Sequence, residues 1–298
     1  GKFEGGWHGG YDGLHKAVSP PYDRPQSMGL LKGVLDEIVV LPFNDLDGVR
    51  RAVKGKELAA IIVEPVMGAG GSIPASRDFL KGLREICDEE GALLIFDEVI
   101  TGFRFYGGAK TYYGVEPDIL TAGKAVGGQY FPGAGAICGR EDVMELLDHI
   151  KRPSFWERAF HGGTFVGNAL TMRAGYTLIT YLEKHGGEVY DYLDRLGRRM
   201  REGLRDVFER HGVDVKISGL GSMIGIHFTK AEPTNPSIVE RFKDKRMSQS
   251  FFKHMLDRGI AFLLPHAPNL FISTAHSELE IDQFIEAAED FAKGLAKS

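Results

Sequence analysis

Cysteine, long apolar runs and clusters of basic residues are scarce in this sequence, and each scarcity excludes a class of protein. Two cysteines among 298 residues, Cys87 and Cys138, are too few for a disulfide framework or a cysteine-based metal cluster. Both lie in apolar segments, so we expect buried free thiols and a reducing, cytoplasmic compartment. No apolar stretch approaches the roughly 18 residues of a membrane span. The net charge is -5 without any basic run, which argues against nucleic-acid binding.

The chain is long enough for one large domain or two moderate domains. Hydrophobic residues make up 43% and charged residues 26%, as in ordinary globular proteins. Helical patterns dominate 167–185 and 188–211. Beyond Gly212 the pattern mixes strands with helices: strands over 221–228 and 269–274, helices over 248–258 and 278–295. We therefore predict a large domain over 1–211 and a smaller α+β domain over 212–298.

Two apolar runs joined by a helix predict a parallel sheet. The run 58–63 is closed by Glu64, and the run 92–96 is followed by Asp97. Between them, Ser76 can cap a helix with one apolar face, and Gly91 can end it. A crossover helix between strands buried on both faces indicates parallel strands in an α/β fold.

Weaker patterns predict further elements. They are a strand over 35–41, a helix over 45–54 capped by Asn44, and strands over 118–121 and 133–138. Ligands of parallel sheets bind beyond the carboxyl ends of the strands. Glu64, Asp97 and Lys124 each follow an apolar run, so we expect all three on that one rim.

Lys124 lies among small residues, in Thr121-Ala-Gly-Lys-Ala-Val-Gly-Gly128. An amine that forms a Schiff base needs little bulk around it. Asp97, at the end of a buried strand, is well placed to hold the proton of a ring nitrogen. These are the two protein groups that pyridoxal phosphate chemistry most requires. A single lysine is more often a solvated surface charge, so the prediction depends on the pair.

Several segments, in this order, resemble the class III (subgroup II) aminotransferases of the fold-type I pyridoxal phosphate enzymes. They are Phe-Glu-Gly-Gly-Trp-His-Gly at 3–9, Glu-Pro-Val at 64–66, Phe-Asp-Glu-Val-Ile-Thr-Gly-Phe-Arg at 96–104, Gly-Lys at 123–124, Gly-Gly-Thr-Phe-Val-Gly-Asn at 162–168 and Phe-Ile-Ser-Thr-Ala-His-Ser at 271–277. Within the family they are most similar to the glutamate-1-semialdehyde 2,1-aminomutases and related aminotransferases. The resemblance implies a large domain, with a mainly parallel sheet flanked by helices, and a smaller α+β C-terminal domain.

The resemblance also implies roles for particular residues. Lys124 matches the lysine that forms the Schiff base with pyridoxal 5'-phosphate and later moves protons at the substrate carbon. Asp97 matches the carboxylate that keeps the pyridine nitrogen protonated. Val99 matches the residue packed on one face of the ring, and Trp7 occupies the aromatic position that stacks on the other face.

Three more residues are candidates for the site. His8 is expected near Asp97 as a supporting partner. Glu64 can contact the site or serve as a structural hydrogen-bond partner, and Glu98 can serve as a structural hydrogen-bond partner. Thr164 matches a threonine that reaches the cofactor phosphate of the neighbouring subunit, which implies a homodimer with shared active sites. No metal ion is expected, and the substrates are expected to be a small amino donor and a carbonyl acceptor.

Departures from the family pattern leave alternatives open. The family's phosphate-cradling turn at a helix N-terminus, which precedes the segment at 3–9, is not among these residues, so we expect a longer protein or a partner piece to supply it. The turn at 127–133 is longer than in the aminomutases, and Pro268-Asn-Leu stands where an acidic residue is expected. We therefore favour an aminotransferase. The alternatives are an aminomutase, a racemase or decarboxylase with the same residues, and a non-catalytic or incomplete component.

Overall fold

The computed structural model describes residues 1–127, 134–262 and 269–295, whose contacts form two units. Unit 1 comprises Gly1–Lys56, Val66–Leu80 and Glu188–Ser298, and unit 2 comprises Glu57–Pro65 and Lys81–Gly187. We describe each unit by itself. Residues 128–133 of the expected long turn, and Pro268, lie outside the described residues. The predicted domain boundary near Gly212 stays a prediction.

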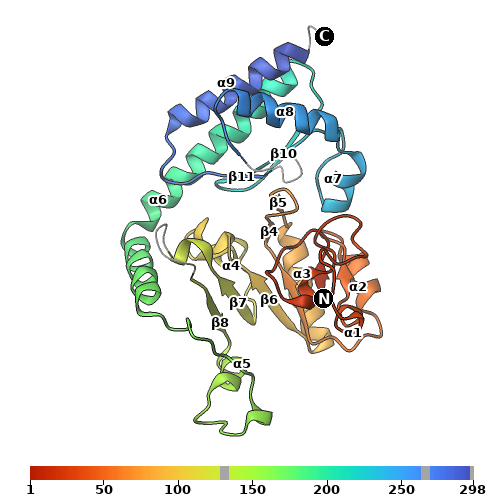
Figure 1. The fold of residues 1–298 in the computed structure, drawn as a ribbon, viewed down its shortest axis with the longest axis vertical. Helices are drawn as coiled ribbons and strands as arrows, with labels where there is room; N and C mark the ends of the chain where they lie inside the picture. Colours follow the sequence, from red (N-terminus) through yellow and green to blue (C-terminus); the bar gives the residue numbers. More distant parts are fainter. Residues whose placement is uncertain (128–133, 263–268, 296–298) are drawn as a thin grey trace. The chain divides into compact units, whose positions relative to one another are not determined.

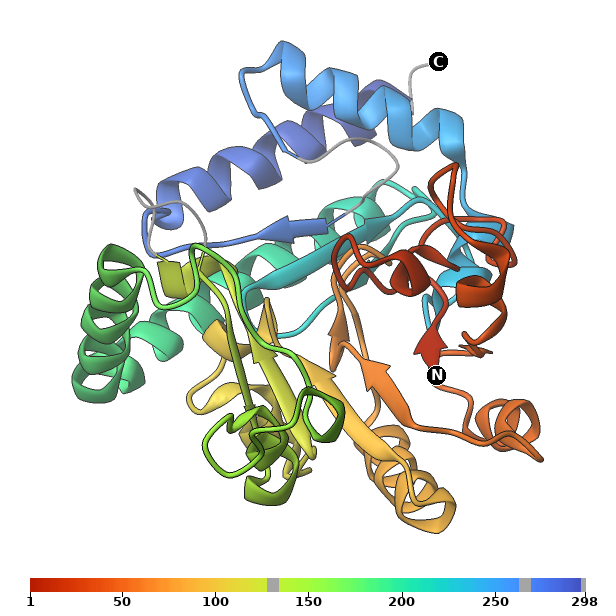
Figure 2. The same ribbon diagram turned by 60° about the horizontal axis from the view of Figure 1, so that its bottom comes forward.

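Unit 2 contains the sheet that carries most of the candidate site (Figures 1 and 2). Its strands are β3 (Ala60–Val63), β6 (Leu93–Asp97), β7 (Ile119–Ala122) and β8 (Ala136–Gly139). The first three run parallel in the order β3-β6-β7, and β8 pairs antiparallel with β7. The predicted, mainly parallel sheet is therefore confirmed, with one antiparallel strand.

The helix between β3 and β6 forms as its sequence predicts. Helix α3 (Arg77–Glu90) begins after Ser76, whose Oγ accepts a hydrogen bond from the Phe79 N–H at 3.1 Å. Its apolar face is almost fully buried, at Phe79, Leu80, Leu83, Ile86 and Cys87. Gly91 follows with φ +65°, the left-handed conformation that commonly ends a helix.

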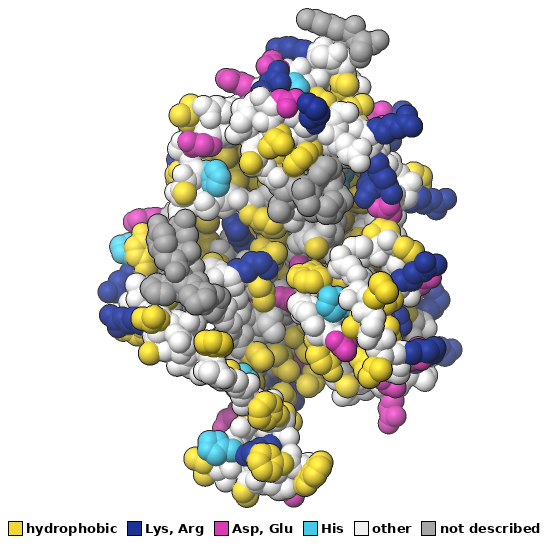
Figure 3. Space-filling model, viewed as in Figure 1, with side chains coloured by type: hydrophobic (Ala, Val, Ile, Leu, Met, Phe, Trp, Pro, Cys, Tyr) yellow, Lys and Arg dark blue, Asp and Glu magenta, His cyan; other side chains and the backbone are white. Residues whose placement is uncertain are grey.

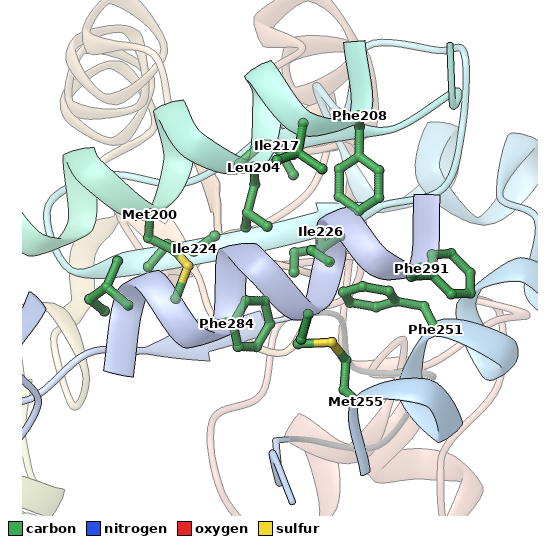
Figure 4. Close-up of a cluster of buried hydrophobic side chains, with 14 of the residues drawn as sticks. Met200, Leu204, Phe208, Ile217, Ile224, Ile226, Phe251, Met255, Phe284 and Phe291 are labelled. Carbon is green, nitrogen blue, oxygen red and sulfur yellow. The ribbon is translucent and has the colours of Figure 1, made fainter. Parts of the chain in front are cut away.

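Unit 1 has its core between helices and a small antiparallel sheet. The sheet has the order β11-β10-β9, from β9 (Lys216–Ser218), β10 (Met223–His227) and β11 (Asn269–Phe271). Side chains from α6 (Ala169–Arg210), α8 (Lys245–Asp257) and α9 (Glu278–Leu295) pack on it (Figure 4). Buried aromatic rings, Phe208, Phe251, Phe284 and Phe291 among them, fill this core.

Shorter elements complete the described part of the chain. Unit 1 also has the parallel pair β1 (Lys2–Phe3) and β2 (Val40–Leu41), the hairpin β4 (Val66–Met67) and β5 (Ile73–Pro74), and helices α1 (Lys32–Asp36), α2 (Leu46–Val53) and α7 (Pro236–Phe242). Unit 2 adds α4 (Gly108–Tyr113) and α5 (Glu141–Met144). Single 3-10 turns cover Asp12–His15, Thr101–Phe103, Lys124–Gly127, Glu145–Leu147 and Phe155–Glu157.

Several expectations about local structure were wrong. Residues 35–36 belong to α1, so the strand expected over 35–41 is only Val40–Leu41. Asp45, not Asn44, caps α2, because the side-chain oxygen of Asn44, which a cap would use as acceptor, accepts a hydrogen bond from the Ser76 N–H at 3.0 Å instead. The two helices expected around 186–187 form one helix, α6, since an interior glycine costs a helix only about 1 kcal/mol.

The two thiols differ in environment. Both cysteines are free, as expected. Cys87 is buried, but Cys138 is exposed, contrary to the expectation, because it lies on β8, which has a described neighbour on one side only. Among the described residues, no helix combines the length and the apolar character that crossing a membrane requires.

Candidate active site

The carboxyl ends of three neighbouring strands place three of the candidate residues at one edge of the unit 2 sheet. Glu64 directly follows β3, Asp97 is the last residue of β6, and Lys124 comes two residues after β7. Val63 pairs with Phe96, and Asp97 pairs with Thr121, so the strand ends are level with one another. This is the rim at which parallel sheets bind their ligands.

Asp97 is buried and held by hydrogen bonds from β7 and from the turn after β6. Its side chain is 7% exposed. Its Oδ1 accepts hydrogen bonds from the Val99 N–H at 3.1 Å and from the Thr121 Oγ1–H at 3.3 Å. The two donors fix the direction of the carboxylate, because one belongs to the turn after β6 and the other to β7. An oriented acidic side chain of this kind can hold a proton on a ring nitrogen.

Val99 and Gly123 leave little room beside the lysine. A side-chain Cβ built on Gly123 would lie 3.2 Å from Val99 Cγ1 and 3.4 Å from Val99 Cγ2. Such contacts are tighter than ordinary van der Waals packing, so glycine lets the Lys124 segment approach Val99 closely. The small residue before Lys124 therefore has a steric reason in the structure.

Lys124 combines an exposed side chain with an unusual backbone. It opens a 3-10 turn, Lys124–Gly127, with φ +48°, in the left-handed region that residues other than glycine rarely adopt. Backbone strain of this kind often occurs at functional sites. The Lys124 amine makes no hydrogen bond or ion pair within the described ranges. An amine without a competing partner is available to a carbonyl compound.

The other predicted site residues lie elsewhere in the chain. Trp7 and His8 belong to unit 1, where the 42% exposed Trp7 ring lies edge-on to the ring of His15. Thr164 lies in unit 2, in the exposed segment before α6, and its hydroxyl makes no hydrogen bond to a described residue. The expected contacts of these three residues with a cofactor stay predictions.

Sequence reasoning missed two residues that support the site. Thr121 was seen as part of the lysine segment, but its hydrogen bond to Asp97 depends on the pairing of β6 with β7. Glu98 was expected at most to be a structural partner. It is fully buried beside Asp97. The signal for Glu98 in the sequence was Gly107-Gly108, since both glycines have positive φ and Gly108 leaves space for the glutamate carboxylate.

These residues fit pyridoxal phosphate by their chemistry. A buried, oriented carboxylate and an accessible amine stand on the same rim, and Gly123 keeps the backbone between them free of bulk. Asp97 would hold the ring nitrogen, Val99 would contact the ring face and Lys124 would bind the aldehyde carbon.

Comparison with known proteins then assigns the family. The model of the class-III aminotransferases matches residues 11–288. The chain belongs to the class-III aminotransferase family. Members of this family are pyridoxal-phosphate-dependent enzymes that transfer amino groups, so the predicted fold type, enzyme class and cofactor are confirmed.

The relatives include both aminomutases and transaminases. The chain is 36% identical to a glutamate-1-semialdehyde 2,1-aminomutase of Caldicellulosiruptor saccharolyticus, over 99% of this chain and 68% of the relative. An ω-transaminase structure from Sphaerobacter thermophilus matches with a TM-score of 0.85 at 32% identity, covering 100% of this chain and 68% of the other. A β-phenylalanine aminotransferase from Variovorax paradoxus gives 0.80 at 32% identity, over 98% and 63%. This chain thus spans about two thirds of the length of the proteins it matches.

Proposed function

We propose that this protein transfers an amino group from a small amino compound to a carbonyl acceptor, with Lys124 and Asp97 as its catalytic residues. The observation that supports this most directly is the pairing at the strand ends. There Thr121 binds the Asp97 carboxylate and leads within three residues to Lys124, whose amine has no partner among the residues that the structure describes. When bound, pyridoxal phosphate supplies an aldehyde that captures amines and a protonated ring that withdraws electrons.

The chain's own residues divide the work around that ring. Asp97 holds the proton on the ring nitrogen, and its hydrogen bonds from Val99 and Thr121 keep it pointing toward the rim. Lys124 would hold the cofactor through its amine and would also take and return the proton at the substrate carbon. Val99 packs on one face of the ring.

The remaining candidates act at the edges of the same site. Trp7 stacks on the second ring face and His8 supports Asp97. Glu64, 6% exposed at the end of β3, contacts the cofactor. Thr164 donates its hydroxyl to the cofactor phosphate of a second subunit. The resulting assembly is a homodimer in which each active site uses residues of two chains.

Exposed apolar residues support the homodimer. The segment from α5 into α6 carries hydrophobic side chains that are largely open to solvent (Figure 3). They include Ile150 (80%), Phe155 (74%), Trp156 (96%), Phe160 (84%), Phe165 (82%) and Leu170 (63%). Exposed apolar residues gathered in one segment, here around Thr164, are typical of a protein–protein interface. We place the protein in the cytoplasm because the exposed Cys138 is a free thiol.

An aminomutase is the second candidate, because several of the matched proteins carry that name. An aminomutase returns the nitrogen to a neighbouring carbon of the same molecule. Incubation of ¹⁵N-labelled glutamate-1-semialdehyde with an unlabelled keto acid separates the two: a transaminase moves the label to the keto acid, and an aminomutase retains it in the isomer.

Reduction with borohydride tests the proposal itself. The protein is incubated with pyridoxal phosphate, reduced and digested, and the peptides are analysed by mass spectrometry. We expect the cofactor adduct on Lys124, and none on that peptide in Lys124→Ala. An adduct on a different lysine would contradict the assignment. No adduct and no visible absorption would instead favour a non-catalytic component.

Mixed dimers test the role of Thr164. Lys124→Ala chains are combined with Thr164→Ala chains. If Thr164 serves the other subunit, each mixed dimer contains one intact site and one site with both changes, so part of the activity returns. No recovery, or an active monomer in sedimentation, would mean that Thr164 serves its own chain or only precedes α6.

A further inference from the structure

Glu98 is a buried carboxylate that has no role in the function proposed above. Its side chain is 0% exposed. Burial raises the pKa of the Glu98 carboxyl, although the hydrogen bonds it accepts favour the charged form. A buried carboxylate is costly unless its oxygens are well paired, so its partners indicate why it is there.

The partners of Glu98 lie on α4 and in the turn after β6. Oε2 accepts hydrogen bonds from the Ala109 N–H and from the Thr101 Oγ1–H at 3.1 Å, and Oε1 accepts one from the Lys110 N–H at 2.9 Å. The amides of Ala109 and Lys110 are in the first turn of α4, where backbone N–H groups have no acceptor within the helix itself. Glu98 thus fastens the turn after β6 to the start of α4.

The backbone shows that this arrangement is built for a carboxylate. Gly108 has φ +78°, and a Cβ on Gly108 would lie 2.7 Å from Glu98 Oε2. Only glycine combines this backbone with space for the glutamate oxygen. The Glu98 N–H donates to Thr121 O at 3.0 Å, and its carbonyl oxygen accepts from the Gly102 N–H at 2.9 Å.

Two neighbours of Glu98 donate the hydrogen bonds that hold Asp97. Thr121, whose carbonyl binds the Glu98 N–H, donates its hydroxyl to Asp97 Oδ1. Val99, the next residue in the turn, donates its N–H to the same oxygen. Both donors to Asp97 are therefore tied to Glu98, one through the strand pairing and one through the turn.

We propose that Glu98 is a positioning residue, whose carboxylate ties the turn after β6 to α4 and thereby keeps the Val99 N–H and the Thr121 hydroxyl on Asp97. This inference deepens the proposed function and rests on it for its catalytic consequence. The geometric part concerns only this chain's residues and can be tested without cofactor.

The test compares Glu98→Gln with wild type. A glutamine has one acceptor oxygen, so its NH₂ group must face the N–H of Ala109 or Lys110, and the turn loses part of its attachment. In the protein without cofactor, we expect amide hydrogen exchange at Val99 to be about tenfold faster or more under native conditions. With cofactor, we expect kcat to fall about tenfold or more while KM for the amino donor changes by less than about twofold.

Glu116→Gln is the matched control. Glu116 is exposed, and its carboxylate pairs with the side chain of the same Lys110, at 2.9 Å from Nζ. We expect this variant to keep wild-type exchange at Val99 and wild-type kcat. If Glu98→Gln does not fold, Thr101→Val removes one of the three hydrogen bonds with little change of shape, and it should speed Val99 exchange by a smaller factor.

Two results would overturn the inference. One is wild-type exchange at Val99 in Glu98→Gln or, if that variant does not fold, in Thr101→Val. The other is faster exchange with unchanged kcat, which would make Glu98 a residue of stability alone. Failure of the proposed function is separate, because wild-type protein would then show no Lys124 adduct whatever the exchange at Val99.

Discussion

Replacing Asp97 by asparagine should separate the chemistry of the site from its fold. Asp97 Oδ1 accepts two hydrogen bonds, from the Val99 N–H and the Thr121 hydroxyl. The amide oxygen of asparagine can accept both, so the local structure should remain. The neutral amide cannot hold the proton of a pyridine nitrogen as a carboxylate does, so the ring loses its capacity to accept electrons.

The magnitudes follow from these contacts. Each net hydrogen bond contributes about 0.5–1.5 kcal/mol, so Asp97→Asn should unfold within about 1 kcal/mol of wild type, while Asp97→Ala loses both bonds and about 1–3 kcal/mol. Loss of the charge should raise the barrier by several kcal/mol, which slows amino transfer on the order of 10²-fold or more in both variants.

Single-turnover absorbance measures the rate, and denaturant unfolding measures the stability. The cofactor is first shown to be bound on Lys124, and its conversion by the amino donor is then followed in a stopped-flow instrument. Near-normal turnover by Asp97→Asn would refute the role of the carboxylate. A slow variant that is also strongly destabilised would mean that Asp97 mainly holds the fold.

Three further predictions concern backbone strain, pH and close packing. Lys124→Gly should be more stable than Lys124→Ala by about 1 kcal/mol in denaturant unfolding, because glycine relieves the φ of +48° and alanine does not; equal stabilities would refute the strain. Burial lowers the pKa of His227 to about 4 from 6.5, so the fold keeps it neutral while the unfolded chain takes up a proton. The contribution of neutral His227 to the free energy of unfolding should therefore be fully present above pH 6.5 and should fall by up to about 3 kcal/mol toward pH 4. His227→Gln should remove this part of the pH dependence of unfolding. In thermal unfolding, Gly225→Ala should lose about 3 kcal/mol or more of stability, because its Cβ would lie 2.0 Å from the Gly71 carbonyl oxygen. Gly294→Ala in α9, where a Cβ meets open space, should not be destabilised in the same measurement.

The elements that the sequence predicted well are those whose pattern is local. Apolar runs without alternation marked β3 and β6, and Ser76 and Gly91 marked the two ends of α3. The regular apolar spacing of 278–295 gave α9 with its observed bounds. Because parallel strands end at one edge, these local patterns were enough to place Glu64, Asp97 and Lys124 on the same rim.

The tertiary structure decided the side-chain partners and the burial of residues that depend on segments distant in the sequence. Asn44 was expected to cap α2, but the N–H of the distant Ser76 donates to its side-chain oxygen instead. Cys138 was expected inside, but its strand has one described neighbour and stays exposed. No local pattern reports such competition between distant partners.

The same distinction applies within the candidate site. The sequence by itself determined the lysine, the aspartate and their rim, since each follows from the residues beside it. The hydrogen bond from Thr121 to Asp97 depends on the register between β6 and β7. The hydrogen bonds from the α4 amides to the Glu98 carboxylate depend on the close approach of Gly108 to that carboxylate. Register and close approach are set by packing across the sheet, so only the folded chain could decide them.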